Sequence, residues 1–401
     1  MLIRKSNLHL GAISVLLYHI VFVRWYYVEN YDLWKYGFIA LNAVLILPLI
    51  KRTISRKDLL INILIALFII LFLYSSYRNP GNINGTLFRG IIYAVVIIEI
   101  FLVIKGFANA GQMRLFLNVF YKLSVFYAVV SDIFLVFLPS YAESNLMNYF
   151  VGNKFILSYL HIYIIILYLV LKWDGVSHLT VRKYPMFMVY ICWAVIISYV
   201  TDCSTGLVGC LLLVVFILYL RNLLTANIWL VVLLIADTVL LFFDAVILSQ
   251  PAVQYFITKI LGETLDLHGR LQMYDTIIPI FSTERIWGYG VNNHHIVLYS
   301  LVKAPNAQNG ILNCLIQFGI AGTVVLLITL YMMLRKGKNI NRSVPIMALI
   351  MMMSVISSVE ITIDIYFILF CAIIWGISIQ SETLQNKEVK DEKFPCKKCC
   401  F

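Results

Sequence analysis

The chain has 401 residues, of which 62% are hydrophobic and only 13% are charged. Soluble globular domains are nearer 45–50% apolar and about 25% charged. This composition therefore excludes an ordinary soluble enzyme, a disordered protein and a disulfide-stapled secreted module. The formal net charge of +11 fits either a nucleic-acid partner or the cytoplasmic loop bias of a membrane protein, and the distribution of the charges decides between the two.

Apolar stretches long enough for transmembrane helices follow one another along the chain. The clearest runs from Leu59 to Tyr74, with Asn62 as its only strongly polar residue. The first two are weaker, because an aromatic-rich stretch between Arg24 and Lys35 could lie at the membrane interface. We expect an all-α, polytopic integral membrane protein with about twelve spans, at residues 8–23, 33–50, 58–76, 87–104, 115–139, 155–171, 185–200, 204–220, 227–248, 308–334, 343–360 and 364–380.

The positive residues divide unevenly between the loops when the N-terminus is placed inside. Segments on the inner side then hold 21 of the 31 lysines and arginines, the outer segments hold 9, and Lys122 lies within the fifth predicted span. Cytoplasmic loops carry such an excess, so both termini are expected in the cytoplasm. The first apolar stretch lacks an obvious small-residue cleavage site and is expected to be a retained helix. The charge thus describes topology, and no nucleic-acid partner is predicted.

One outer loop is far longer than the others. The predicted organisation is a membrane domain of nine spans (1–248), this extracytoplasmic loop (249–307), three further spans (308–380) and a cytoplasmic tail (381–401). Loops longer than about 12–15 residues are usually functional or disordered. This loop is rich in aromatic and apolar residues, so we expect short helices at about 254–261 and 271–280, lying in the membrane interface.

The sequence contains no recognisable cofactor or metal motif. There is no P-loop and no His-Glu-x-x-His pattern. The Cys396 and Cys399 pair has the spacing of zinc ligands but lacks a second pair. We therefore expect neither a metal nor another cofactor.

Several short motifs occur in a fixed order in and after the long loop: His268-Gly269-Arg270, Tyr274, Trp287-Gly288-Tyr289-Gly290, Gln308-Asn309-Gly310 and Phe318-Gly319-Ile320-Ala321-Gly322. In this order they resemble the O-antigen polymerase and ligase superfamily. There a Gly-Arg motif opens the loop, a Gly-Tyr-Gly-like turn follows, a His-Asn pair starts the next span, and a Phe-Gly-Ile-x-Gly-like stretch continues it. Upstream, Gly152-Asn153-Lys154-Phe155 and Cys203-Ser204-Thr205-Gly206 are similar to Gram-positive capsule and exopolysaccharide polymerases.

The resemblance implies a membrane glycosyltransferase, a Wzy-type polymerase in the cytoplasmic membrane of a bacterium. Such an enzyme joins undecaprenyl-pyrophosphate-linked oligosaccharide repeat units into capsule, exopolysaccharide or O-antigen on the outer face. A sugar hydroxyl of one unit is the acceptor, and the lipid pyrophosphate of another is the leaving group. The expected partners are the lipid-linked oligosaccharide, membrane lipids, a chain-length regulator and a flippase.

The anionic leaving group calls for cations on the outer face, and the planar fork of arginine can bind phosphate bidentately. Arg270 and Arg285 are the candidates in the loop, and Arg89 is a third at the start of span four. The alternatives are ion pairing within the loop or with lipid headgroups, and for Arg89 snorkelling to the interface.

A base for the acceptor hydroxyl would come from His295 or His294, because histidine titrates near neutral pH, or from the carboxylate of Asp202. Capping of the eighth span is the alternative for Asp202. One departure from the superfamily is Gln308, since glutamine cannot accept a proton at neutral pH. Candidate substrate-binding residues are Arg89, His268, Tyr274, Gln308 and Asn309. Gln308 and Asn309 start span ten, where a helix N-terminus favours anions, and helix capping is an equal alternative.

Two other functions remain open on the sequence. A ligase that transfers finished glycan to a terminal acceptor would share the same chemistry. A flippase or transporter would have the same span number, and it would more often show broken helices near the midplane. Charged residues within the predicted spans allow a proton or cation pathway, or else pairing within the bundle and a polar cavity face; they are Glu99, Lys122, Asp132, Asp237 and Asp244.

Overall fold

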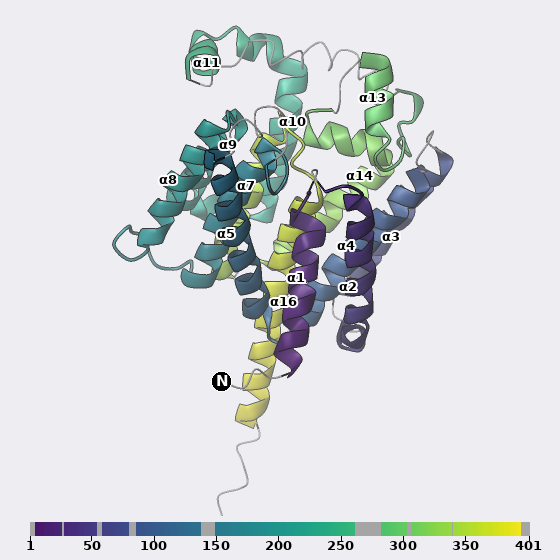
Figure 1. Ribbon diagram of the computed structural model, residues 1–401, viewed down its shortest axis with the longest axis vertical. Helices are drawn as coiled ribbons and strands as arrows, with labels where there is room; N and C mark the ends of the chain where they lie inside the picture. The colour runs from purple at the N-terminus through teal and green to yellow at the C-terminus, as the bar shows by residue number, and fades with distance from the viewer. Residues whose placement is uncertain are drawn as a thin grey trace, which may run out of the picture.

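The computed structural model describes residues 5–25, 28–53, 58–79, 86–137, 149–260, 282–302, 307–338 and 340–393. This part of the chain is almost entirely helical and contains one isolated bridge, Tyr149 to Gly152, and no strand (Figure 1). The prediction of an all-α protein is therefore confirmed. The α-helices are α1 (Lys5–Phe22), α2 (Tyr31–Thr53), α3 (Leu59–Arg78), α4 (Thr86–Asn109), α5 (Met113–Phe137), α7 (Lys154–Lys172), α8 (Pro185–Val200), α9 (Ser204–Leu218), α10 (Ala226–Leu248), α11 (Pro251–Tyr255), α13 (His294–Val302), α14 (Gly310–Lys336), α15 (Val344–Ile356) and α16 (Ile365–Lys393).

Each of the twelve predicted spans overlaps one of these helices. By length and composition, seven of the described helices can cross a membrane: Tyr31–Ile50, Leu59–Arg78, Leu87–Asn109, Met113–Phe137, Lys154–Lys172, Gly310–Lys336 and Ile365–Gln385. The other five overlaps are shorter apolar stretches, Asn7–Phe22, Pro185–Val200, Ser204–Leu218, Ala226–Val239 and Asn341–Ile356. In the predicted outer loop, α11 continues into a π-helical turn, Phe256–Ile260, while 271–280 lies outside the described residues.

The outer surface of the bundle carries many large apolar side chains. Large hydrophobic side chains such as Leu47, Ile63 and Ile70 are more than half exposed, and many others resemble them. A water-soluble monomer rarely exposes so much contiguous apolar surface. Together with the span-length helices, this surface is that of a membrane-embedded protein.

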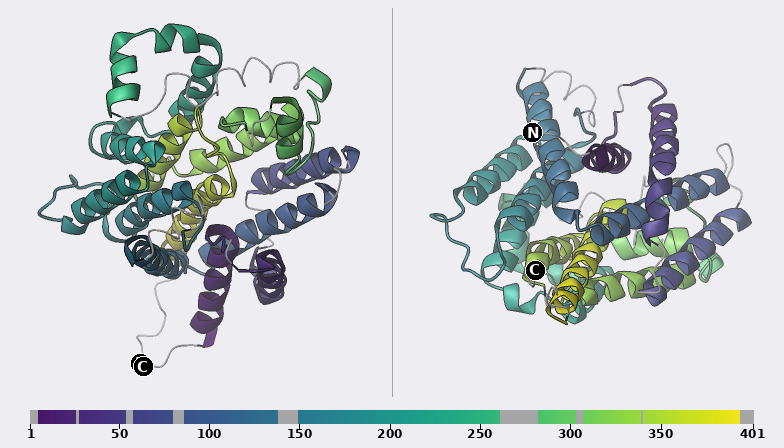
Figure 2. Two further views of the ribbon diagram at one scale, coloured as in Figure 1. Left: turned by 45° about the horizontal axis from the view of Figure 1, so that its top comes forward. Right: turned by 90° about the horizontal axis from the view of Figure 1, so that it is seen from below.

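The centre of the bundle is formed by α7, α15 and α16 (Figure 2). α15 has 13 residues, which at 1.5 Å each is about 20 Å, short of the ~30 Å hydrocarbon core. The segment that follows it, 357–364, is non-helical. This segment is partly or fully buried by the surrounding helices, and it lines a cavity that is described below.

The two ends of the bundle differ. α1 begins and α16 ends at one end, which we call the terminal end, while α11 and α13 lie at the opposite, loop end (Figure 1). The first and last described helices therefore have their outer ends at the same end of the bundle. Which side of a membrane this end faces stays a prediction.

Candidate functional site

A cavity of about 670 Å³ lies at the loop end. Its wall combines the end of α1, the starts of α2, α4, α7 and α14, the turn before α13, and the non-helical segment 357–364. These elements come from two separate parts of the chain, residues 20–163 and 291–366. The cavity is therefore a product of the tertiary fold, not of the long loop alone.

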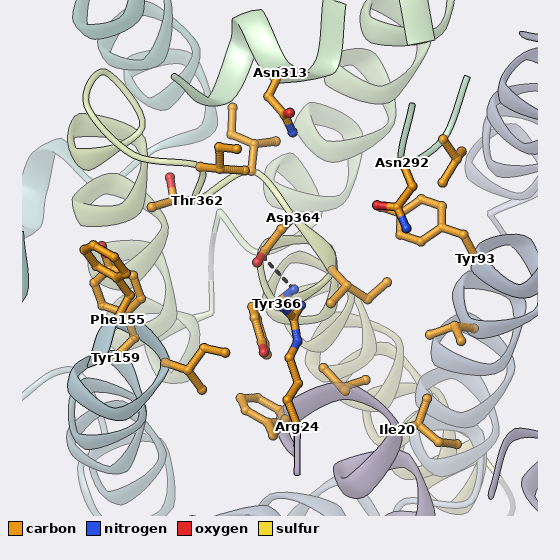
Figure 3. Close-up of a pocket in the computed structure, with 18 of the residues that line it drawn as sticks. Ile20, Arg24, Tyr93, Phe155, Tyr159, Asn292, Asn313, Thr362, Asp364 and Tyr366 are labelled. Carbon is orange, nitrogen blue, oxygen red and sulfur yellow. Dashed lines mark hydrogen bonds between the residues drawn. The ribbon is translucent and has the colours of Figure 1, made fainter. Parts of the chain in front are cut away.

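Charges of both signs face this cavity. The basic residues are Arg24, Lys35 and Arg89, the acidic residues are Asp32, Glu360 and Asp364, and His295 is also part of the lining. Arg24 is directed at the carboxyl of Asp364 (Figure 3), and Lys35 interacts favourably with Asp32. Arg89 is exposed, and within the described chain no carboxylate lies within ion-pair distance of it.

The rest of the wall offers aromatic faces and amides. Tyr93, Phe155 and Tyr159 project toward the space shown in Figure 3. Asn313 is 5% exposed, its side chain points into the cavity, and its Oδ1 has no hydrogen-bond partner within the described chain. A buried acceptor without a hydrogen-bond partner reduces stability by about 1–3 kcal/mol. A hydroxyl or N–H group of a ligand could donate the hydrogen bond that Asn313 Oδ1 lacks.

One wall depends on a break in α14. Gly319 has φ 65° and ψ −175°, which interrupts the helix. The freed amides of Ile320 and Ala321 donate to the carbonyls of Arg285 and Ile286, at 2.9 and 3.1 Å. In return the amides of Tyr289 and Gly290 donate to the carbonyls of Ile316 and Gln317, at 2.7 and 3.0 Å. The backbone groups released by the break are thus satisfied by the segment 285–290, as buried backbone requires.

This docking explains two glycines of the sequence motifs. A Cβ on Gly319 would lie 2.2 Å from the Ile286 carbonyl oxygen, and a Cβ on Gly288 would lie 2.4 Å from the Gly319 nitrogen. Both glycines also have positive φ, which other residues adopt only at a cost. The Trp287-Gly288-Tyr289-Gly290 and Phe318-Gly319-Ile320 motifs, read separately in the sequence, therefore form one contact.

Side chains from the end of α3 fasten the same segment. Asn79 donates to the Gly288 carbonyl at 2.9 Å, and the amide of Val291 donates to the Ser76 hydroxyl at 3.1 Å. The Gln317 side chain accepts from the amide of Asn292 at 3.0 Å. These bonds fix the segment between the α14 break and α13, and they thereby position Asn292 and His295 at the cavity.

Two of the predicted site residues, Arg89 and His295, line the cavity. Arg285 and Asp202 do not. Arg285 is exposed and contributes its backbone carbonyl to the α14 break. Asp202 is exposed in the turn between α8 and α9, where its carbonyl accepts from Lys154 at 2.7 Å, and no side-chain bond caps α9.

The N-terminal cap of α14 is occupied by side chains of the bundle, although the turns that follow it line the cavity. Asn309 is fully buried and caps the helix by accepting from the amide of Leu312 at 2.9 Å. The carboxylate of Asp237 accepts from the amide of Ile311 at 3.4 Å and from the hydroxyl of Ser357 at 2.5 Å. The carboxyl group of Asp237 already occupies this helix N-terminus, so the capping interpretation holds for Asn309. Its neighbour Gln308 is partly buried and does not line the cavity either.

The remaining predicted residues cannot be placed beside the cavity. His268, Arg270 and Tyr274 lie outside the described residues. His294 is the first residue of α13, and its side chain is likewise outside the described part. Their predicted roles in catalysis and substrate binding stay predictions.

Most described charges within the predicted spans are paired inside the bundle. Glu99 accepts from the Asn42 side chain at 2.8 Å. Asp132 contacts His161 at 3.3 Å and accepts from the Trp193 indole at 2.6 Å. Lys122 is exposed, and the side chain of Asp244 lies outside the described residues. With Asp237 at the start of α14, these contacts favour pairing over a continuous proton or cation pathway.

The sequence analysis did not select five charged residues of the cavity: Arg24, Asp32, Lys35, Glu360 and Asp364. Arg24 and Lys35 stand in the aromatic-rich stretch that looked interfacial, and both belong to the small outer set of positive residues. Asp364 precedes a span as a typical helix cap. Treating all the predicted outer lysines and arginines as candidates would have included Arg24 and Lys35.

The comparisons with known proteins do not narrow the class of the chain. No model of a known protein family matches it, and no curated protein sequence matches it. What the fold and the site define is an apolar helical bundle with a mixed-charge, aromatic-lined cavity at its loop end.

Proposed function

We propose that this protein is a membrane glycosyltransferase that polymerises undecaprenyl-pyrophosphate-linked repeat units into a bacterial surface polysaccharide. The observation that carries the proposal is the cavity at the loop end. Arg24, Lys35 and Arg89 supply cations for a pyrophosphate, whereas Asp32, Glu360 and Asn313 supply acceptors for sugar hydroxyls. Aromatic faces beside them suit the apolar faces of sugar rings.

The proposal includes twelve spans with both termini in the cytoplasm. With the positive-inside bias of the loops, the loop end then faces outward, on the side where lipid-linked units are polymerised. A lipid-anchored donor can reach such a site from the outer leaflet. Arg89, without a carboxylate partner in the described chain, is the cation most available to its pyrophosphate.

The test is incubation of the purified, lipid-reconstituted chain with lipid-linked repeat units in the absence of nucleotide sugar. A ladder of lipid-linked polymer on a gel is the expected product. Units that stay single in the presence of folded protein would rule out the polymerase. Addition of a terminal acceptor distinguishes a ligase, which would move glycan to that acceptor without forming a ladder.

One observation favours a second candidate, a lipid-linked oligosaccharide flippase. α14 is a broken helix, a feature common in transporters. Against this, the backbone groups freed by its break bond to the segment 285–290 and are not directed at a ligand. In cells, deletion of a polymerase leaves single repeat units on outward-facing lipid, whereas deletion of a flippase removes the outward-facing units.

A further inference from the structure

Asp364 is held at the cavity wall by the start of a helix. It ends the non-helical segment 357–364, and its Oδ1 accepts the amides of Tyr366 at 2.9 Å and Phe367 at 3.3 Å. These are among the N–H groups that a helix start leaves without intrahelical partners. Asp364 also lines the cavity. The carboxyl group is thus fixed in orientation while it faces the space in which a ligand would lie.

Arg24 reaches the same carboxyl group from the end of α1 (Figure 3). Its positive charge favours the ionised form of Asp364. A guanidinium group binds phosphate as well as carboxylate, so an incoming pyrophosphate competes with Asp364 for Arg24. Ligand binding and the state of Asp364 are therefore coupled.

The other two carboxylates of the cavity lie in different surroundings. Asp32 is exposed in the first turn of α2, beside Lys35. Glu360 accepts the amide of its own neighbour Ile361 at 3.1 Å. Asp364 is distinguished by its place at the start of α16, where two backbone amides fix its orientation.

We propose that Asp364 is the general base that activates the acceptor hydroxyl, and that Arg24 is the cation that passes from Asp364 to the donor pyrophosphate. This inference rests on the proposed polymerase function. It deepens that function by assigning the proton acceptor, for which the sequence offered His295, His294 or Asp202.

In the reaction, the acceptor oxygen bonds to the anomeric carbon of the donor while its proton moves to the Asp364 carboxylate. The bond from that carbon to the pyrophosphate oxygen breaks, and its electron pair leaves with the lipid pyrophosphate. Arg24 and Arg89 bind the negative charge that develops there. Asp364 then releases the proton to water, so atoms and charges balance without a further reactant.

The surroundings of Asp364 suit a base that works near neutral pH. It precedes the apolar stretch Ile365–Gln385, and burial raises its pKa to about 7, against the opposing effects of Arg24 and of the amides of Phe367 and Tyr366. Among the described residues, the phenols of Tyr93, Tyr159, Tyr163 and Tyr366 and the thiol of Cys314 lie around it. Phenols and thiols ordinarily titrate above about pH 8. When Arg24 turns to the pyrophosphate, the carboxylate loses a stabilising charge and becomes a stronger base.

The matched variant is Asp364→Asn, because asparagine is as good a helix cap as aspartate but cannot take the proton. With lipid-linked units and the reconstituted chain, we expect kcat to fall about 100-fold or more, as for loss of a general base, with KM within about threefold of the unchanged chain. Glu29→Gln, an exposed carboxylate at the same end and outside the cavity, is the control and should leave the rate unchanged. Asp364→Glu should restore part of the rate.

The pH profile gives a readout that a structural role would not move. The rate of the unchanged chain should rise with pH through about 7, as Asp364 loses its proton, and His295→Gln should keep this rise. If the rise disappears in His295→Gln, or if Asp364→Asn polymerises within about threefold of the unchanged rate, Asp364 is not the base. If the unchanged chain makes no polymer, the proposed function itself fails. If Asp364→Asn does not fold, the profile of His295→Gln decides alone.

Discussion

At the residue scale, the cations of the cavity differ in whether a carboxylate lies beside them. Arg24 faces Asp364, and Lys35 lies beside Asp32, so each must exchange a carboxylate for an incoming phosphate. Arg89 carries no such partner in the described chain. An anionic ligand therefore does not have to displace a carboxylate to bind Arg89. Loss of Arg89 should weaken the binding of such a ligand most directly.

We predict that Arg89→Ala lowers kcat/KM for lipid-linked units by about 10- to 100-fold, because a hydrogen bond to an ionised group is worth about 1.5–3 kcal/mol. Arg89→Lys should recover part of this loss, since lysine keeps the charge without the fork. The control is Lys259→Ala, an exposed cation at the loop end and outside the cavity. Equal rates for Arg89→Ala and the unchanged chain in the polymer assay would exclude Arg89 from pyrophosphate binding. Arg285→Ala in the same series tests the loop arginine.

The buried carboxyl group of Asp237 has a structural role at the start of α14. Asp237→Ala removes the acceptor for Ser357 and for the amide of Ile311, so we expect unfolding in detergent to become easier by about 1–3 kcal/mol. Asp237→Asn keeps an oxygen acceptor and should lose less. Thermal unfolding of both variants, compared with the exposed-site variant Glu29→Ala, measures the difference. Unchanged stability of Asp237→Ala would contradict the assigned anchoring of α14.

At the element scale, the break in α14 is the feature on which the loop end depends. A continuous helix would keep its own amides and carbonyls paired and would leave the segment 285–290 without a place to dock. The interruption at Gly319 creates four backbone hydrogen bonds between two segments that the sequence separates. Through Val291 and Asn292 they position one wall of the cavity.

Gly319→Ala should therefore damage both stability and activity. Its Cβ would meet the Ile286 oxygen at 2.2 Å while the backbone keeps a positive φ, and we expect a loss of more than about 2 kcal/mol. Gly37→Ala is the matched control, because that helical glycine has open space around it and alanine favours helix. Melting temperature in detergent and polymer yield measure the effect. A Gly319→Ala chain as stable as Gly37→Ala would mean that the break is not required.

At the scale of the whole molecule, the sequence predicted the helices well and the site only in part. Long apolar runs identified twelve of the fourteen α-helices in the described chain, since a stretch of bilayer length leaves a strong local signal. The cavity has no such signal, because Arg24, Arg89 and Asp364 meet only after the helices pack. Arg89 and His295 were predicted because each is a cation or a histidine in or beside a predicted outer segment, which the sequence alone shows. Asp364 reads in the sequence as a helix cap, which it also is, and its second role depends on the packing of α1 against α16.

The twelve-span topology can be tested at α10, which joins the two ends of the bundle but whose described apolar stretch, Ala226–Val239, is shorter than a full span. Asn222 and Ser249 are exposed just before and just after this helix. We predict that Ser249→Cys reacts with a membrane-impermeant maleimide on intact cells, whereas Asn222→Cys reacts only after permeabilisation. The modified residue is identified by mass spectrometry, so native cysteines need not be removed. Labelling of Asn222→Cys alone on intact cells would invert the orientation and place the cavity on the cytoplasmic side, where an outer-face polymerase could not use it. Labelling of both would mean that α10 does not cross.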